Sequence, residues 1–431
     1  MNVLWLVSIT IPAAAAACGL PAREVGGGWL TGQLGALAAL PDAPALTICS
    51  VDARLAAPAS GAAEGIRYRV LNAAPNMLGA AFSKLLREGG FDLVHIWGTE
   101  YPAAAALHKA ALAAGVPALV GIQGVMADCA AHLLDGVPDR YRKAGPVEHA
   151  INRVVPGALL DLSQKNFDAL AASEAALLQN ARYVTGRTAF DRAAVSRMAP
   201  AARYYPCNET LRPGFYTGAC WTPRTFGAAP RLLMTQGNYP LKNLHTALAA
   251  LPALRRRWPG LTLDVAGWPP LDKGPLLRPV IARMFPYQTF CRRLARQLGV
   301  ADCVHYTGPL AESAMRQAYL DADCYLLPSF SENSPNSLGE AMLLGLPCVA
   351  SRVGGIPDLL ADGTEGRRYA PATDPAALAD AVAAVLASPD EGAALGAAAR
   401  KRALSTHDPA ANAAQLQAIY RAILIEEARR P

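Results

Sequence analysis

One stretch decides the fold: residues 324–351 read CYLLPSFSENSPNSLGEAMLLGLPCVAS. The apolar runs Cys324–Leu327 and 347–350 are short and uncharged, as buried parallel strands are, and a helix-sized segment separates them. Ser334 is placed to cap that helix and Pro335 suits its first position, while small or apolar residues recur at positions 338, 341, 342 and 345. The stretch therefore predicts a strand–helix–strand unit.

The start of the predicted helix is a candidate anion site. Free backbone N–H groups and partial positive charge at a helix start favour an anion, most readily a phosphate. Two carboxylates flank this position, Glu332 in the preceding loop and Glu340 inside the helix. Because a carboxylate repels a phosphate but accepts hydrogen bonds from hydroxyls, the pattern favours a nucleotide-sugar as the ligand.

The same region resembles a known family. Segment 328–357, with its Glu-x7-Glu spacing and the following VGGIPD at 353–358, is similar to the signature of retaining GT-B glycosyltransferases of family 4, the glycosyl transferases group 1, in a bacterial branch. The alternative, a capped helix whose glutamates are only solvated, is disfavoured by the surrounding PS, GEAM and GLPCVAS matches. The resemblance implies an α/β protein of two Rossmann-like, doubly wound parallel-sheet domains that face one another across a cleft.

The resemblance also implies an activity. We expect an enzyme, a retaining hexosyl- or related transferase, that moves a sugar from a nucleotide diphosphate-sugar donor to a carbohydrate or lipid-linked acceptor. Synthesis of bacterial cell-surface polysaccharide or glycolipid is the expected process. The family's mechanism implies no metal and no cofactor apart from the donor substrate.

Composition limits the choice of partners and compartment. The chain has 431 residues, 52% hydrophobic and 17% charged, which predicts two or three folded domains. Its net charge of +6 suits an anionic donor, a phosphorylated acceptor or an acidic membrane surface, and is too small to indicate nucleic acid. Nine scattered cysteines without a Cys-x2-Cys pair argue against zinc and for a reducing compartment. We expect a cytoplasmic protein, or one peripheral to the inner face of the membrane.

The N-terminal residues favour a strand over a targeting segment. Residues 1–20 are apolar, but no Lys or Arg precedes Arg23, so the basic region of a signal peptide is missing. Residues 3–7 serve better as a first buried strand. No stretch reaches the ~18–20 clean apolar residues that a membrane-spanning helix needs.

Alternation of strand-like and helix-like segments sets the domain plan. Strand-like runs at 45–49, 66–71, 91–96 and 116–122 alternate with helical stretches, as in a doubly wound sheet whose ligands bind at the carboxyl ends of the strands. We expect an acceptor-binding domain at 1–217, a Gly/Pro-rich linker at 218–230, a nucleotide-sugar-binding domain at 231–407, and a terminal helix at 408–431 that crosses back to the first domain.

The first domain is expected to supply a glycine-rich loop and the acceptor side. In the loop at 24–34, the resemblance places Gly27 and Gly28 near the donor phosphates. His95, Trp97 and Gln123 end two predicted strands and match acceptor-side segments, although a buried structural histidine remains an alternative for His95. Many family members have histidine where Gln123 stands, and glutamine cannot take a proton near neutrality. We expect Gln123 to contact acceptor or donor-sugar hydroxyls.

A basic, irregular segment at 139–155 is a further candidate for acceptor binding. It could contact a phosphorylated or lipid-linked acceptor or an anionic bilayer, and the alternative is a solvated loop.

The second domain is expected to bind the donor and carry the catalytic residues. Lys242 matches a family lysine that stabilises the leaving diphosphate, whereas Gln236 stands where arginine is common and could only donate a hydrogen bond. The resemblance implies that Glu332 holds the donor-sugar hydroxyls and that Glu340 accepts from the ribose. Backbone amides complete the expected diphosphate site, around Ser334, Asn336 and Ser337.

Two other functions stay open from the sequence. A non-catalytic nucleotide-sugar-binding protein would use the same motif without transfer, and a GT-B phosphorylase or epimerase would share the architecture. Neither the sugar, the base nor the acceptor follows from the sequence.

Overall fold

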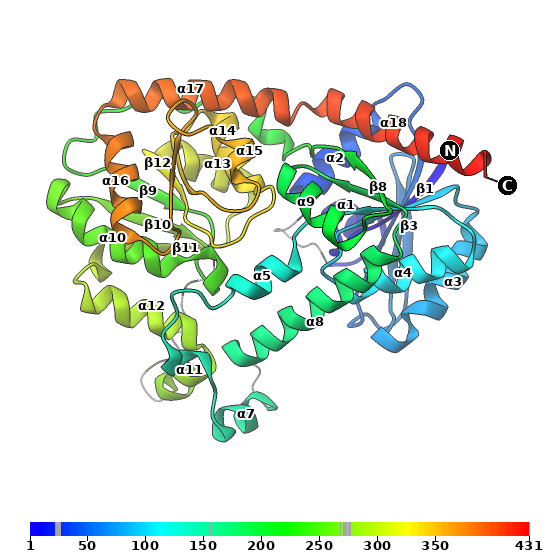
Figure 1. The fold of residues 1–431 in the computed structure, drawn as a ribbon, viewed down its shortest axis with the longest axis horizontal. Coiled ribbons are helices and arrows are strands. Elements are labelled where there is room, and N and C mark those ends of the chain that lie inside the picture. The colour runs from blue at the N-terminus through cyan, green and yellow to red at the C-terminus, as the bar shows by residue number, and fades with distance from the viewer. Residues whose placement is uncertain (22–26, 155–156, 268, 270–273, 275–276, 431) are drawn as a thin grey trace. The chain divides into compact units, whose positions relative to one another are not determined.

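The chain forms two compact α/β units in a computed structural model that describes residues 1–21, 27–154, 157–267, 269, 274 and 277–430 (Figure 1). The first unit contains Met1–Met126, Leu170–Arg212 and His407–Pro431, and the second contains Ala127–Ala169 and Pro213–Thr406. Each unit holds one predominantly parallel sheet. The predicted fold class, two parallel-sheet α/β domains, is confirmed.

The sheet of the first unit runs in the order β3-β4-β2-β1-β5-β6-β7-β8. β3 pairs antiparallel with β4, and the other neighbouring pairs are parallel. The chain moves outward from β1 and then returns to its other side at β5, so the strand order reverses between β1 and β5. Ligands of such sheets bind at the carboxyl ends beside this reversal. The strands are β1 (Asn2–Leu6), β2 (Ala45–Val51), β3 (Ala59–Ala63), β4 (Ile66–Leu71), β5 (Leu93–Trp97), β6 (Ala118–Gly121), β7 (Tyr183–Gly186) and β8 (Arg203–Pro206).

The sheet of the second unit runs in the order β11-β10-β9-β12-β13-β14, with parallel neighbours. Here the order reverses between β9 and β12. The loop after β9 leads to Lys242 and the loop after β12 carries Glu332, so the topology brings both predicted catalytic residues to one end of the sheet. The strands are β9 (Arg231–Met234), β10 (Thr262–Ala266), β11 (Val304–Gly308), β12 (Cys324–Leu327), β13 (Cys348–Ser351) and β14 (Arg367–Tyr369).

Helices cover both sheets; α10 and α16, for example, pack together in the second unit (Figure 1). Those assigned to the first unit are α1 (Pro12–Ala17), α2 (Gly28–Ala38), η1 (Pro75–Met77), α3 (Leu78–Gly89), α4 (Pro102–Ala113), α9 (Ala189–Met198) and α18 (Pro409–Ala428), while α5 (Met126–His132) and α8 (Leu160–Gln179) have residues in both units. The second unit has α6 (Asp139–Arg142), α7 (Pro146–Asn152), η2 (Pro213–Phe215), η3 (Pro240–Lys242), α10 (Leu244–Arg257), α11 (Arg278–Met284), α12 (Pro286–Gln297), η4 (Ala301–Cys303), α13 (Glu312–Asp321), α14 (Asn336–Leu344), α15 (Ile356–Leu359), α16 (Pro375–Leu386) and α17 (Pro389–Thr406). Among the described residues, none of these helices has the length and apolar character that crossing a bilayer requires.

The deciding stretch forms the predicted strand–helix–strand unit, β12–α14–β13. Its strands pair in parallel and are fully buried. The helix starts slightly later than the sequence predicts: Pro335, not Ser334, is the N-cap, and it makes no side-chain cap hydrogen bond. Gly345 does not continue the apolar face but ends the helix, in a left-handed conformation with φ of 80° that glycine adopts at low cost.

Two parts of the expected domain plan differ from the structure: the first domain at 1–217 and the linker at 218–230. Ala127–Ala169 belongs to the second unit, because Leu133 packs there with Leu241 and Phe330. The segment 218–230 has no regular secondary structure, as a linker would, yet it is anchored within the second unit. Arg224 forms a bidentate ion pair with Asp323, with Nε and Nη2 each 2.7 Å from a carboxylate oxygen, so these residues are part of that unit.

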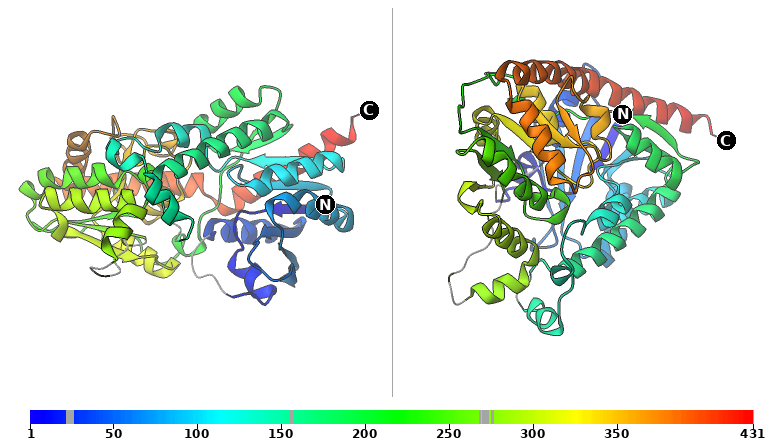
Figure 2. Two further views of the ribbon diagram at one scale, coloured as in Figure 1. Left: turned by 90° about the horizontal axis from the view of Figure 1, so that it is seen from below. Right: turned by 60° about the vertical axis from the view of Figure 1, so that its left-hand side comes forward.

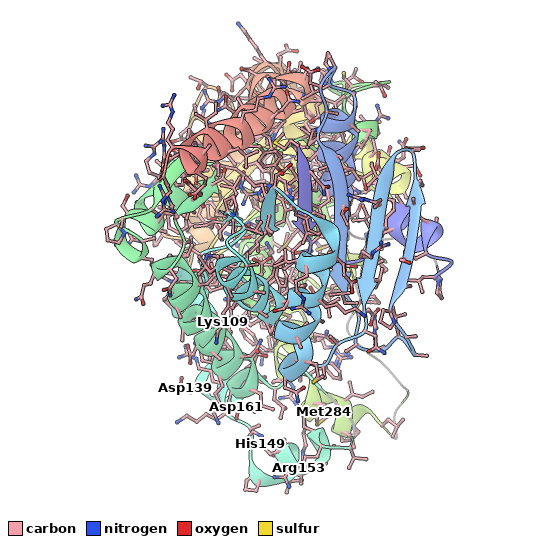
Figure 3. All side chains as sticks on the ribbon, turned by 90° about the vertical axis from the view of Figure 1, so that its right-hand side faces the viewer. Lys109, Asp139, His149, Arg153, Asp161 and Met284 are labelled. Atoms are coloured by element: carbon pink, nitrogen blue, oxygen red, sulfur yellow. The ribbon has the colours of Figure 1, made fainter. Side chains whose placement is uncertain are left out.

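The segment 139–155 is largely helical, which corrects the expectation of an irregular loop. Within its described residues it forms α6 and α7, and α7 lies beside α11 in the views of Figures 1 and 2. Just after it, the Ala158 amide donates to the Met284 carbonyl at 2.8 Å. Figure 3 shows Asp139, His149 and Arg153 at the same end of the structure as Met284.

Candidate functional site

Asn243 fixes the loop that carries Lys242. This residue caps α10 in a left-handed conformation with φ of 56°, which asparagine tolerates better than most side chains. Its Nδ2 donates to the carbonyls of Pro328 at 2.9 Å and Ala372 at 2.8 Å. The same side chain therefore caps a helix and ties the loop after β9 to the loop after β12, which carries Glu332.

Lys242 and Glu332 form an ion pair with Nζ and Oε1 2.5 Å apart. Their side chains are only 18% and 10% exposed. Burial alone would lower the pKa of Lys242, but the Glu332 carboxylate outweighs burial and raises that pKa above its usual value. The ammonium is therefore charged at neutral pH. Since it has three N–H donors, the pair with Glu332 leaves further donors for an anion.

The Glu332 loop is held rigidly. The Ser329 hydroxyl donates to Oε1 of Glu332 at 2.8 Å, and the Gly355 amide donates to the Glu332 carbonyl at 2.9 Å. Gly354 has φ of 50°, and a Cβ there would overlap the Glu332 carbonyl oxygen. The glycines of the VGGIP sequence thus allow its backbone to approach closely, and this contact holds the backbone of Glu332 in place.

Unpartnered polar atoms gather at the start of α14. Asn333 is 8% exposed, and within the described part of the chain neither its buried Nδ2 nor the buried Oδ1 of Asn336 has a hydrogen-bond partner. A buried donor and acceptor without partners are costly, so each is a candidate for contact with a ligand. They lie beside Glu332 in the chain and at a helix start, where an anion is favoured.

The other predicted donor-site residues take different positions. Ser334 and Glu340 are buried, and the Ser337 carbonyl accepts from the Tyr319 hydroxyl at 3.0 Å. Gln236 is exposed and its Oε1 accepts from the Tyr239 hydroxyl at 3.4 Å, a weak bond. The structure therefore brings Lys242 and Glu332 together, while the nucleotide contacts of these four residues stay predictions.

Sequence reasoning missed the contribution of α5 to this site. Asp128 Oδ2 accepts a 2.5 Å hydrogen bond from Ser331, the residue before Glu332, and Cys129 Sγ lies 3.6 Å from the same hydroxyl. No local motif marks Asp128. Its role depends on the long-range packing of Leu133 against Phe330.

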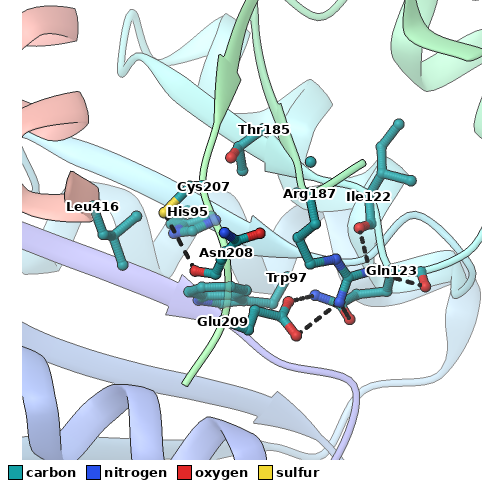
Figure 4. Close-up of a pocket in the computed structure, with 12 residues that line it drawn as sticks. His95, Trp97, Ile122, Gln123, Thr185, Arg187, Cys207, Asn208, Glu209 and Leu416 are labelled. Carbon is teal, nitrogen blue, oxygen red and sulfur yellow. Dashed lines mark hydrogen bonds and ion pairs between the residues drawn. The ribbon is translucent and has the colours of Figure 1, made fainter. Parts of the chain in front are cut away.

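A second polar cluster lies at the carboxyl ends of β6 to β8 in the first unit (Figure 4). Arg187 pairs with Glu209 at 2.7 Å, and these side chains are 3% and 4% exposed. Gln123 Nε2 donates to Glu209, and its Oε1 accepts from Arg187 at 3.2 Å. Each end of the Gln123 amide therefore has a partner inside the protein, and the predicted contact with sugar hydroxyls stays a prediction. The sequence alone assigned no role to Arg187 or Glu209, because only their contacts across the fold bring them together.

His95 is a core residue, the alternative that the sequence left open. It is fully buried, shares a 2.7 Å hydrogen bond with the Tyr420 hydroxyl, and stacks on Trp97 with ring centroids 3.9 Å apart. Burial lowers its pKa to about 3, so the ring is neutral. Trp97 is buried as well, and its Nε1 has no partner among the described residues, so the predicted acceptor contacts of His95 and Trp97 stay predictions.

The glycine-rich loop is described only in part, because residues 22–26 lie outside the described residues. Gly27 caps α2 with φ of 70°. A Cβ on Gly28 would overlap the side chain of Arg212, so the bare backbone here allows a cation to cover the start of α2. The expected contact of these glycines with donor phosphates stays a prediction.

Burial raises the pKa of two further carboxyl groups in the first unit. Glu174 accepts from the Thr99 hydroxyl at 2.5 Å and from the Met126 amide at 3.0 Å, and its pKa is raised to about 7. Burial also raises the pKa of Glu100, whose Oε2 has no partner. Within the described residues, no three His, Cys, Asp or Glu side chains are grouped to bind a metal. That the reaction needs no metal stays a prediction.

Part of the chain is similar to known sequences. Residues 230–388 match the family model described as glycosyl transferases group 1. D-inositol 3-phosphate glycosyltransferase of Corynebacterium glutamicum is 28% identical over 302 residues, covering 69% of this chain and 66% of that protein. GDP-mannose-dependent alpha-(1-6)-phosphatidylinositol monomannoside mannosyltransferase of Mycolicibacterium smegmatis is 31% identical over 185 residues, 41% of this chain and 44% of that protein. The chain thus spans less than two thirds of the length of these curated relatives.

Solved structures share the fold over nearly the whole chain. Sucrose-phosphate synthase of Thermosynechococcus elongatus matches with a TM-score of 0.70 at 18% identity, covering 99% of this chain and 100% of that one. Anabaena HepE in complex with UDP matches with a TM-score of 0.64 at 15% identity, covering 98% and 100%. At these identities the likeness establishes the fold alone.

Proposed function

Since its second domain belongs to the glycosyl transferases group 1, we propose that this protein transfers a sugar from a nucleotide diphosphate-sugar to an acceptor hydroxyl, with retention of anomeric configuration. The observation that carries the proposal is the Lys242–Glu332 pair, together with Asn333 Nδ2 and Asn336 Oδ1 at the start of α14, which have no partner among the described residues. A cation, a helix start and unused hydrogen-bonding groups form a site suited to a sugar diphosphate.

In this proposal each charged residue has one task. Lys242 binds the diphosphate, whose bond to the anomeric carbon breaks while the acceptor oxygen forms its bond to that carbon and passes its proton to the departing diphosphate oxygen. Glu332 accepts from donor-sugar hydroxyls and orients the anomeric carbon, and Glu340 accepts from the ribose. A donor aimed at charge that develops in the transition state is worth about 10²–10³ in kcat, so Lys242 carries a large share of the rate.

The names of related proteins support candidate substrates. The Anabaena HepE structure contains UDP, and the M. smegmatis relative is named for GDP-mannose, so uridine and guanosine donors are the first to test. Both named bacterial relatives act on inositol phosphate or phosphatidylinositol compounds. We propose an acceptor from bacterial glycolipid or cell-surface polysaccharide synthesis, and a reaction that proceeds without a metal.

A transfer assay with labelled nucleotide-sugars tests this proposal. We expect nucleoside diphosphate release coupled to a glycosylated product whose anomeric configuration, determined by NMR, is that of the donor, and we expect the same rate in EDTA. Glu332→Gln and Lys242→Ala should each lower kcat at least about 10²-fold. The exposed Lys401→Ala and Glu391→Gln on α17 serve as charge-matched controls and should not change it.

Three results would contradict the proposal. Near-normal turnover in both site variants would remove Lys242 and Glu332 from the mechanism. A sugar phosphate formed with inorganic phosphate as acceptor would indicate a phosphorylase. Donor binding without nucleotide release across a broad acceptor panel would indicate a binding protein.

A further inference from the structure

A basic cavity of about 380 Å³ lies in the second unit, between α6–α7 and α11–α12. Two stretches far apart in sequence build it, and they are fastened by the bond from the Ala158 amide to the Met284 carbonyl and by the Glu148–Arg283 ion pair at 3.6 Å. A Cβ on Gly157 would lie 2.6 Å from the Met284 oxygen, so glycine is required for this close approach. These contacts hold the two walls of the cavity together.

Positive charge is in excess around this cavity. Arg140, Lys143, Arg283 and Arg293 line it, and Glu148 is the carboxylate among its lining residues. Neighbouring acids are engaged elsewhere: Asp139 pairs with Arg142 at 3.5 Å, and Asp161 with His149 at 2.9 Å. Like charges held close together repel, so an anion that enters the cavity relieves this repulsion.

Tyr141 lies within this cluster of cations. The guanidinium of Arg140 lies 5.1 Å from its ring centroid, and Arg293 donates to its hydroxyl at 3.3 Å. Burial alone would raise the pKa of Tyr141, but the two arginines outweigh burial and lower it. The lowered phenol pKa has the same cause as the two contacts: the positive charge of these arginines favours negative charge at this point of the cavity.

Thr289 adds a hydrogen-bond donor without a partner. Its side chain lines the cavity and is 5% exposed, and its buried Oγ1 has no hydrogen-bond partner among the residues that the structure describes. Thr289 is in the first turn of α12, a helix of 12 residues whose start faces the cavity through Pro286. An unused hydroxyl and a helix start both suit an oxygen-rich anion.

A second cavity, which shares Leu160 with the basic cavity, is lined by residues of the loop that carries Lys242. Leu160 lines both the basic cavity and this mostly apolar cavity of about 290 Å³, whose other lining residues include Phe167, Tyr239 and Pro240. Tyr239 and Pro240 immediately precede Lys242 in the chain, and Tyr239 is in contact with its ammonium, 5.8 Å from the ring centroid. A ligand anchored in the basic cavity could therefore extend past Leu160 toward the proposed donor site.

We propose that the basic cavity binds the phosphate of a phosphorylated acceptor. This assignment rests on the proposed glycosyl transfer, and it names the substrate class: a phosphate ester whose remaining part occupies the adjoining apolar cavity. Several cations and a hydroxyl match the several oxygens of a phosphate better than the two of a carboxylate. The ester can be a soluble metabolite or a lipid headgroup, since both present the same phosphate.

Calorimetric titration with glycerol 3-phosphate tests the soluble source in the full-length protein. Arg293→Gln and Arg140→Gln should each weaken binding about ten- to a hundredfold, because each removes a charge-assisted contact. Arg296→Gln, on the same helix but not lining the cavity, is the matched control and should bind normally. Because phosphate could also bind at Lys242, the titration is repeated with Lys242→Ala and with UDP present, and neither should abolish binding.

Thr289→Val provides a second test, because it should change stability and binding in opposite directions. Valine has the same shape without the partnerless hydroxyl, so this variant should melt at a higher temperature than the wild type while it binds glycerol 3-phosphate more weakly. A variant that only damages the fold would lower the melting temperature. Unchanged binding in Thr289→Val and in both arginine variants would overturn the proposal.

Co-sedimentation with vesicles distinguishes the lipid source. If glycerol 3-phosphate does not bind, vesicles of phosphatidylglycerol and phosphatidylcholine should sediment the protein, phosphatidylcholine alone should not, and Arg293→Gln should reduce the bound fraction. Absence of binding to both probes would overturn the proposal. The Lys242→Ala variant keeps the two hypotheses apart, because loss of transfer with intact glycerol 3-phosphate binding affects only the donor site.

Discussion

Removing the charge of Lys242 from its pair with Glu332 should destabilise the second unit. At 2.5 Å and an effective dielectric constant of about 20, the attraction between the two charges is ~7 kcal/mol before the cost of desolvation, which offsets much of it. Removal of one partner from a buried pair typically costs about 3–5 kcal/mol. Since Lys242 is 18% exposed, we expect about 2–3 kcal/mol for Lys242→Met, which keeps the length of the side chain and removes its charge.

A double-mutant cycle separates the pair from the individual side chains. Lys242→Met leaves Glu332 charged and deprived of its cation, whereas Glu332→Gln in that background removes this uncompensated charge. The double variant should therefore be more stable than the sum of the single losses by about 2 kcal/mol, measured as free energies of unfolding in urea. Losses that add to within about 0.5 kcal/mol would refute the coupling, and with it the view that Glu332 positions a charged Lys242.

Two further perturbations test other parts of the account. The pKa of Glu174 is raised to about 7 from its usual 4.5, so the stability associated with its protonated form is complete below pH 4.5 and is lost as the pH rises through 7. Glu174→Gln should accordingly gain up to about 3 kcal/mol over the wild type above pH 7 and nothing near pH 4.5; a gain independent of pH in thermal unfolding would contradict this. Gly354→Ala should cost about 2–3 kcal/mol and weaken nucleotide binding, because its Cβ would overlap the Glu332 carbonyl. Gly299→Ala, with a similarly positive φ and open space around it, should cost only about 1 kcal/mol, and equal losses in the two variants would show that the Glu332 contact is unimportant.

Local patterns explain why the core of the fold could be predicted. The unit from β12 to β13 has two short apolar strands, a proline at the helix start and a glycine at its end, so sequence and structure agree to within a residue or two. The family resemblance predicted that Glu332 and Lys242 share one site, and their contact follows from a parallel sheet, which brings the loops at one strand end into proximity. The edge strands β3 and β8 were missed, since Ala59–Ala63 has little strand propensity and Arg203–Pro206 is short and largely exposed.

Long-range contacts explain what the sequence could not provide. Nothing local predicts that Ala127–Ala169 joins the second unit, because the cause is the packing of Leu133 on Phe330 and the bond from Ser331 to Asp128. Likewise, the sequence does not show that the Gln123 amide bridges Glu209 and Arg187. A polar side chain at a strand end can serve the fold or a ligand, and only its partners distinguish the two.

The donor site is tested most directly by a thermal-shift measurement with UDP, GDP and ADP, with and without EDTA. At a concentration of about 100 Kd, a bound nucleotide should add about 2.7 kcal/mol to the stability of the folded protein. We predict a shift with one nucleotide that EDTA does not reduce, that is lost in Glu340→Ala and that is retained in the exposed control Glu391→Ala. No shift with any nucleotide, or an equal shift in both variants, would contradict a nucleotide-sugar site at the start of α14.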